Sequence, residues 1–159
     1  MRSRLAVAAV AILAAGLAAP ALAQPKDIVD TAVAAGSFKT LAKLLADADL
    51  VGVMKGPGPF TVFAPTDEAF AKVPKDVLDG LARDKAKLKA VLEYHVLTSR
   101  WTTDDIKLVK RTGTAEGKPV AFGSSGTTLT VNNAKIVKPN VYCTNGMIHV
   151  IDAVLLPPQ

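Results

Sequence analysis

The chain has 159 residues, half of them hydrophobic, and a single cysteine. Its 19 basic and 14 acidic residues give a formal net charge of +5. This excess is too small to indicate binding to nucleic acid or to an anionic membrane. One cysteine cannot form an internal disulfide, so the stability of the fold has to come from its core.

The first 23 residues are predicted to be a cleaved secretory signal peptide. Arg2 and Arg4 make a short basic start. An almost unbroken apolar run from Leu5 to Leu17 follows, and Ala21-Leu22-Ala23 has the small-x-small pattern of a cleavage site. The run is shorter than the roughly 20 residues that a membrane-spanning helix needs. We therefore expect a protein that does not span the membrane and is exported to the periplasm or secreted, with residues 24–159 forming one domain.

The first half of the remaining chain has the patterns of helices. Asp27 is placed to cap a helix that runs to Ala35 and ends at Gly36. Ser37 is placed to cap a second helix. The apolar stripe of that helix is predicted to consist of Phe38, Leu41, Leu44 and Leu45.

A tight loop at Gly56 to Pro59 separates these helices from a predicted strand, Phe60 to Ala64. Pro65 is expected to end this strand. Thr66 then caps a short helix, and Asp67 in its first turn suits the helix dipole. The sequence thus predicts a helix–strand–helix order around this loop.

Two more helices are expected before the pattern changes. Asp84 begins a longer one, whose apolar face is formed by Leu88, Val91, Leu92 and His95. Thr103, followed by Asp104 and Asp105, indicates the start of a short one. His95 is therefore predicted to lie on the buried side of its helix.

From Lys110 onward the sequence changes to short strands separated by turns. The last strand follows the Asn145-Gly146 turn, contains His149 and reaches Asp152. Earlier strands are expected at Lys118 to Phe122, Thr127 to Val131 and Ala134 to Val137. Helices first and strands later in one small chain predict an α+β fold.

Three segments in this order resemble the motifs of the fasciclin domain family. Gly58 to Phe70 resembles the first signature of that family, and Asn145 to Pro157 resembles the second. Between them, Leu92 to Leu97 contains a Tyr94-His95 pair that is similar to the family's tyrosine–histidine motif. The resemblance covers Asp27 to Pro157 and is greatest to single-domain, secreted bacterial members.

This resemblance implies a compact β-sheet wedge of about seven strands flanked by several helices. It also implies a non-enzymatic adhesion module whose partner is a cell-surface protein or a matrix polysaccharide. In animal members, a tyrosine–histidine region and an Asp-Ile pair are linked to integrin binding. The positions that match, and that we expect to form the interaction surface, are Tyr94, His95, Asp105 and Ile106.

The resemblance leaves two alternatives open. Some members of the family bind apolar pigments such as carotenoids, so the chain could instead be a carrier of an apolar small molecule. Others have been proposed to act on plant polymers, so a weak hydrolase of esters or polysaccharides is the second alternative. Ser99, four residues after His95, is the best-placed hydroxyl for such a reaction, although no Gly-x-Ser-x-Gly elbow is present. We expect no catalytic residues.

No metal or cofactor is expected. The two histidines, His95 and His149, lie far apart in the sequence and do not give the compact ligand spacing of a zinc site with the one cysteine. That cysteine, Cys143, is interpreted as a small buried thiol.

The remaining motif residues are interpreted as structural. His149 can stay neutral, donating from one ring nitrogen and accepting at the other. Asp152 faces the opposite side of an extended strand, so it is expected to accept hydrogen bonds from backbone amides of a nearby loop. Asn145 and Gly146 both tolerate positive φ and mark a tight turn. The full structural set is Thr66, Asp67, Asn145, Gly146, His149 and Asp152.

Overall fold

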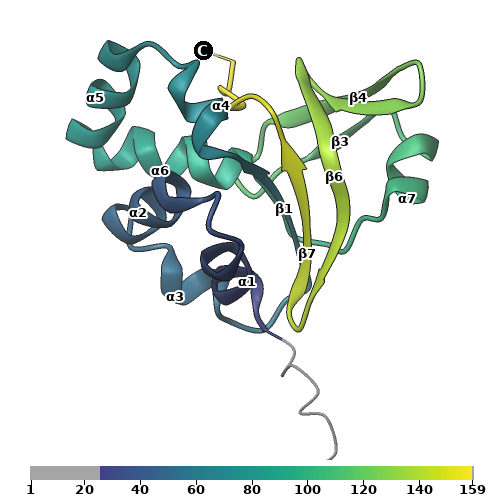
Figure 1. Cartoon of the computed structure of the whole chain (residues 1–159), viewed down its shortest axis with the longest axis horizontal. Coiled ribbons are helices and arrows are strands. Elements are labelled where there is room, and N and C mark those ends of the chain that lie inside the picture. The colour runs from purple at the N-terminus through teal and green to yellow at the C-terminus, as the bar shows by residue number, and fades with distance from the viewer. Residues whose placement is uncertain (1–25, 159) are drawn as a thin grey trace, which may run out of the picture.

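The computed structural model describes residues 26–158. The predicted signal peptide, residues 1–23, lies outside the described residues. Helices α1 to α6 gather on one side of the central strands β1 and β7, and the other strands extend away with α7 on their far side (Figure 1). The fold is a mixed α+β fold, as the sequence pattern predicts, and its sheet has seven strands, as the family resemblance implies.

The helices have the following bounds: α1 Ile28–Ala35, α2 Lys39–Asp47, α3 Val51–Met54, α4 Asp67–Ala71, α5 Lys75–Arg83, α6 Lys85–Tyr94 and α7 Thr103–Leu108. The strands are β1 Phe60–Pro65, β2 Val96–Leu97, β3 Arg111–Gly113, β4 Pro119–Ser125, β5 Thr128–Val131, β6 Ala134–Cys143 and β7 Gly146–Ile151. Within residues 26–158, none of the helices has the length and apolar character needed to cross a membrane.

Local capping chemistry places several helices where the sequence predicts them. The side chain of Asp27 accepts from the amide of Asp30 at the start of α1, and Gly36 ends the helix with a φ of 75°. Thr66 caps α4, and Asp84 caps α6. α7 starts at Thr103 as predicted, and its cap is Thr102, in a reciprocal capping box with Asp105.

The second helix is capped from a distant part of the chain. The prediction that Ser37 caps α2 is wrong, because the N-cap is Phe38, whose side chain cannot accept a hydrogen bond. The carboxylate of Asp67 instead accepts from the amides of Lys39 at 3.3 Å and Thr40 at 2.8 Å. Burial raises the pKa of this carboxyl, but the hydrogen bonds from Thr40 and Lys39, together with the charge of Lys39, outweigh it and leave the pKa lowered. Asp67 therefore fixes α4 against α2.

The seven strands lie in the order β2-β1-β7-β6-β5-β4-β3. The central pair, β1 and β7, is parallel, and the other neighbours are antiparallel. The amide of Ala115, just beyond β3, donates to the carbonyl of Val96 in β2 at 2.8 Å. The two ends of the sheet are thus joined by a hydrogen bond.

The central strands separate two hydrophobic cores. Side chains alternate along a strand, so in β7 Ile148 and Val150 point to the helices while Ile151 points into the wedge. In β1, Val62 belongs to the helical core and Phe63 to the wedge core. Because both faces of β7 are covered, every residue of this strand is buried.

Some elements differ from the sequence predictions. α3, α5, β2 and β3 were not predicted; α5 buries no residue completely, and β2 and β3 have only two and three residues. β6 continues past the predicted end at Val137 to Cys143, through irregular pairing between Lys138 and Val141. Proline cannot donate a hydrogen bond within a sheet, so Pro139 interrupts the strand pattern of the sequence. In the structure, Pro139 lies in the irregular stretch of β6.

Candidate functional site

Tyr94 and His95 lie at the end of α6, inside the molecule. Each has only 2% of its surface exposed, because the apolar face of α6 continues through both residues. Ile106 is the inward-facing residue of α7 and is 1% exposed. Of the four residues expected to form an interaction surface, only Asp105 is exposed. The side chains of the other three are not available to a partner.

The hydroxyl of Tyr94 joins α6 to the sheet. It donates to the carbonyl of Pro119 in β4 at 2.9 Å and accepts from the side-chain amide of Asn132 at 3.0 Å. The side-chain oxygen of Asn132 in turn accepts from the amide of Ala121 at 2.9 Å. Asn132 has a φ of 51° in the turn between β5 and β6, a conformation that asparagine tolerates. Tyr94 thereby fixes this turn against β4.

His95 joins the same helix to the chain that follows β7. Its Nδ1 lies 2.7 Å from the carbonyl of Val91, to which it donates, and its Nε2 accepts from the amide of Leu155 at 2.9 Å. The ring is therefore neutral, with one donor and one acceptor. Complete burial lowers its pKa from 6.5 to about 4. The C-terminal segment Ala153–Pro158 is held in place through this bond.

An open groove of about 540 Å³ lies above these two anchors. Tyr94 and Leu155 are part of its lining, and Arg111 and Asn133 stand exposed at its border. Leu156 is 49% exposed on the side formed by the C-terminal segment. The volume is in the range of small-molecule and cofactor sites, roughly 300–1,000 Å³. Tyr94 thus lines the groove from beneath, and His95 holds Leu155 of the C-terminal segment that forms one side of it. Sequence reasoning missed the groove because its walls come from segments far apart in the chain.

His149 holds the wedge together from β7. Its Nδ1 accepts from the amide of Asn140 at 3.1 Å, and its Nε2 donates to the carbonyl of Trp101 at 2.6 Å. The ring stacks on Phe63 at a centroid distance of 5.7 Å. Burial lowers the pKa of His149, so this ring is also neutral.

Asp152 lies one residue beyond β7 and is half-buried. Its carboxylate accepts from the amide of Lys135 at 2.8 Å, and its own amide donates back to the Lys135 carbonyl at 3.1 Å. The partner is therefore a residue of β6, whereas the sequence analysis expected a loop. These two bonds extend the pairing of β6 and β7 past the last regular residue.

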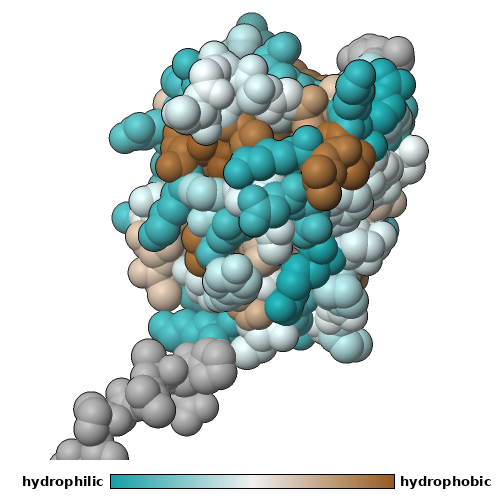
Figure 2. Space-filling view, turned by 90° about the vertical axis from the view of Figure 1, so that its right-hand side faces the viewer, coloured by the Kyte–Doolittle hydropathy of each residue, from teal (hydrophilic) through white to brown (hydrophobic). Residues whose placement is uncertain are grey.

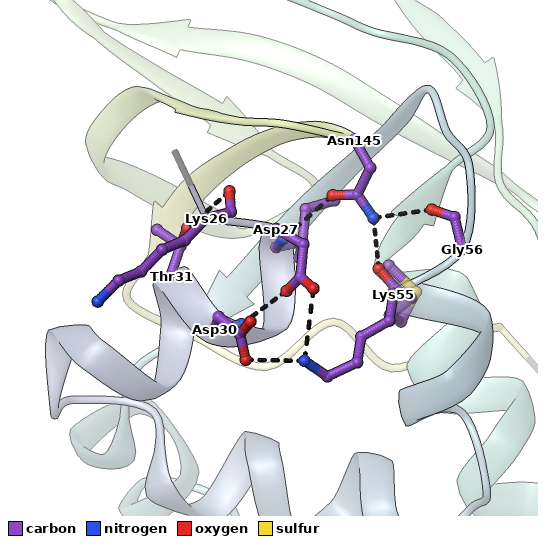
Figure 3. Close-up of polar contacts among 9 residues, drawn as sticks. Lys26, Asp27, Asp30, Thr31, Lys55, Gly56 and Asn145 are labelled. Atoms are coloured by element: carbon purple, nitrogen blue, oxygen red, sulfur yellow. Dashed lines mark hydrogen bonds and ion pairs between the residues drawn. The ribbon is translucent and has the colours of Figure 1, made fainter. Parts of the chain in front are cut away.

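The opposite end of β7 is closed by Asn145 (Figure 3). Its side-chain oxygen accepts from the amide of Ile28 at 3.1 Å. Its amide group donates to the carbonyls of Met54 at 2.7 Å and Gly56 at 2.9 Å. One side chain thereby satisfies the start of α1 and the end of α3. Sequence reasoning assigned Asn145 only a turn and could not find contacts with residues about ninety to more than one hundred positions away.

An ion-pair cluster lies next to Asn145 (Figure 3). The ammonium group of Lys55 is 2.7 Å from the carboxylate of Asp30 and 3.4 Å from that of Asp27. The hydrogen bond from the Asp30 amide, aided by Lys55, lowers the pKa of Asp27. The hydrogen bond to Asp30 raises the pKa of Lys55. Two carboxylates thus face one ammonium group, so the cluster keeps an excess of negative charge and its lysine is already paired.

Gly146 is required by a close approach of two strands. A Cβ atom at this position would lie 2.0 Å from the carbonyl oxygen of Phe60 in β1. The tight turn predicted here is present, with residues 144 and 145 lying between the paired Cys143 and Gly146, but neither Asn145 nor Gly146 adopts the positive φ that both tolerate. The glycine serves packing between parallel strands rather than turn conformation.

The structure offers no evident arrangement for catalysis or for metal binding within residues 26–158. No group of three or more histidine, cysteine, aspartate or glutamate side chains in this range could hold a metal ion. Both ring nitrogens of His95 face backbone groups, so neither is free to activate the hydroxyl of Ser99. Cys143 is buried, and burial raises the pKa of its thiol, which disfavours the reactive thiolate.

Comparison with known proteins gives a consistent result. A model of the fasciclin domain matches residues 36–157. The chain is 40% identical over 130 residues to the uncharacterized protein sll1735 of Synechocystis sp., covering 82% of this chain and 97% of that protein. It is 33% identical to the immunogenic protein MPB70 of Mycobacterium bovis, covering 91% and 78% respectively. Human periostin is 35% identical over 83% of this chain, which spans 16% of periostin.

Among solved structures, a FAS1 domain pair from the insect cell adhesion molecule Fasciclin I has the same fold. The TM-score is 0.64 at 22% sequence identity, and the match covers 79% of this chain and 47% of that one. This chain thus spans about half of the insect domain pair, and the likeness supports the α+β wedge described above. The family model, the sequence relatives and the shared fold together show that this chain belongs to the fasciclin domain family.

Proposed function

We propose that this chain is an exported surface-interaction module that binds an extracellular partner through the groove above Tyr94 and His95. The fasciclin domain family is associated with adhesion and cell-surface interaction. The predicted signal peptide, residues 1–23, supports export. The observation that carries the proposal is the groove itself, an open site of about 540 Å³ whose shape depends on the family's tyrosine–histidine pair.

Binding without turnover accounts best for the polar residues at this site. A general base needs a ring nitrogen that can reach a substrate proton. His95 and His149 each donate to one backbone carbonyl and accept from one backbone amide. Both ring nitrogens of each histidine are thus occupied by backbone groups, so the geometry does not support the hydrolase alternative.

The apolar-carrier alternative is less well supported, because the groove is open and bordered by the polar side chains of Arg111 and Asn133. The enclosed apolar cavity between the helices and the sheet, beside Ala32 and Ile148, measures about 20 Å³. That is room for about one water molecule, and an elongated pigment would need a far larger space. The face that carries α7 and β6 shows hydrophobic patches separated by polar side chains (Figure 2). Leu108 and Val137 are exposed in that part of the molecule.

The experiment is a binding assay with the chain from residue 24 onward and intact cells or extracellular matrix of its own host. We expect saturable retention of the labelled protein. Ala121→Trp places a large ring in the groove at an exposed position of β4, where an aromatic residue suits a strand. This variant should lose most of the retention.

Val53→Trp is the matched control. Val53 is 56% exposed on α3, at the other end of the molecule from the C-terminus (Figure 1). It should bind as the unmodified chain does. Equal retention of both variants would contradict the assignment of the groove, and no retention of the unmodified chain would contradict the proposed function.

A further inference from the structure

We infer that the groove recognises an acidic polysaccharide, one whose sugars carry carboxylates, with Arg111 as the anchoring residue. This inference rests on the proposed function and adds the chemical class of the ligand. It follows from the distribution of charge over the molecule, from the groups that border the groove, and from the state of the sheet edges around it.

The two halves of the described chain carry different charge. Residues 26–99 hold ten basic and ten acidic side chains, so their net charge is zero. Residues 100–158 hold seven basic and four acidic side chains, a net charge of +3. The ion pairs follow the same division: five lysines before residue 100 are paired, but Lys107 alone is paired after it. The net positive charge of the described chain therefore belongs to the half that forms most of the groove.

The cations near the groove have no carboxylate within ion-pair distance among residues 26–158. Arg111 lines the groove from β3. The ammonium group of Lys118 donates to the carbonyl of Pro158, which also lines the groove. Lys135 comes directly after two further lining residues, Asn133 and Ala134. The two nearby carboxylates already accept from backbone amides, Glu116 from Lys118 and Asp152 from Lys135. No acidic residue lines the groove. The site is thus complementary to a negatively charged ligand.

The side chains at the border suit a sugar acid. A guanidinium group binds a carboxylate through two parallel hydrogen bonds, as Arg111 could do from its exposed position. The exposed amide of Asn133 supplies both donors and an acceptor, which match sugar hydroxyls. Leu156 offers an apolar surface beside these polar groups, and the mixture is typical of sites that orient a ligand by a few polar contacts.

The sheet edges argue against an acidic peptide. An extended peptide gains affinity by adding a strand to a free sheet edge. Here the outer strands have two and three residues, and Ala115 joins the two ends of the sheet by its bond to Val96. The amide of Ala121 and the carbonyl of Pro119, which border the groove, already bond to Asn132 and Tyr94. Little backbone is left for a peptide to pair with.

The test is calorimetric titration of the chain from residue 24 with a polygalacturonate oligomer, a neutral dextran oligomer and poly-glutamate. We expect binding of polygalacturonate that weakens with added salt, and no measurable binding of dextran. Arg111→Gln should weaken binding about tenfold, because a charge-assisted hydrogen-bond pair is lost. Arg111→Lys keeps the positive charge but loses the paired donors of the guanidinium group. Its affinity for polygalacturonate should therefore lie between that of the unmodified chain and that of Arg111→Gln.

Lys43→Gln is the matched control, since it removes one positive charge from an exposed position on α2. It should bind as the unmodified chain does. An equal loss in Lys43→Gln and Arg111→Gln would overturn the inference, because it would reduce the effect to net charge. Equal binding of poly-glutamate would overturn the choice of a saccharide. Retention on host cells without polygalacturonate binding would overturn the inference and leave the proposed function standing.

Discussion

The two ends of β7 are built from the same family motif but are finished in different ways. At its start, Asn145 and Gly146 seal the molecule, with every polar group of the Asn145 side chain bonded and no room for one extra carbon atom. Beyond its end, the chain turns into Ala153–Pro158, which is tied to His95 and leaves an open groove. The sealed end gives stability, and the open end leaves side chains free for a partner.

The largest expected effect tests the sealed end. Gly146→Ala would place a carbon 2.0 Å from the Phe60 carbonyl, so β1 and β7 would have to separate. We expect the free energy of unfolding to fall by roughly 4 kcal/mol or more. Gly113→Ala is the matched control at the other side of the molecule, since nothing lies within 4 Å of its Cβ position. Urea unfolding should separate the two variants; equal stability would mean that the strands near Gly146 are not closely packed.

A pH titration tests the anchor beneath the groove. Burial keeps His95 neutral and lowers its pKa from 6.5 to about 4. Between these values the unfolded chain binds more protons than the folded one, so the free energy of unfolding falls as the pH is lowered. The contribution of the neutral His95 is therefore fully present above pH 6.5 and is lost as the pH falls toward 4. The loss amounts to roughly 3 kcal/mol. In His95→Gln, urea unfolding should show a clearly smaller pH dependence over this window, and an unchanged slope would contradict the assignment.

Removing the amide of Asn145 tests whether one side chain holds the sealed end. Asn145→Ala leaves the Ile28 amide and the carbonyls of Met54 and Gly56 without their partner. Because Asn145 is only half-buried, water can reach part of the gap, and we expect a loss of about 2 kcal/mol. Asn133→Ala, an exposed asparagine at the groove, should change thermal unfolding far less. A larger loss of thermal stability in Asn133→Ala than in Asn145→Ala would contradict the role given to Asn145.

The smallest effect concerns the hydroxyl beneath the groove. Tyr94→Phe removes the hydrogen bonds to Pro119 and Asn132 but keeps the buried ring. We expect a loss of about 1 kcal/mol in the free energy of unfolding. Hydrogen exchange should increase at the Ala121 amide, which depends on Asn132. Hydrogen exchange that increases at the Asn145 amide instead would contradict the claim that Tyr94 stabilises the groove end of the molecule.

Local signals in the sequence were enough for much of the fold. The caps at Asp27, Thr66 and Asp84 and the last strand after the Asn145-Gly146 turn depend on neighbouring residues, and the structure confirms them. The cap of α2 by Asp67 depends on a residue in another helix and was assigned to Ser37. α5 was missed although Leu78 and Leu81 recur at helical spacing; both are only partly buried against the helical core, and no residue of this helix is buried completely.

The candidate site was harder to predict than the fold. The helical spacing of Leu88, Val91, Leu92 and His95 already put His95 on a buried face, while the family resemblance pointed to a surface at the same position. The structure shows that the buried pair organises a groove from below. The groove residues, such as Arg111 and Leu156, come from segments that only the folded sheet brings together.

The most direct measurement of the difference between the two ends is a map of ligand contacts by NMR. Amide shifts of the labelled chain would be followed while a polygalacturonate oligomer is added. We expect shifts that cluster at Arg111, Ala121 and Asn133, with none at Lys55 or Asn145. Shifts centred on Asn145, or spread evenly over the exposed lysines, would contradict it.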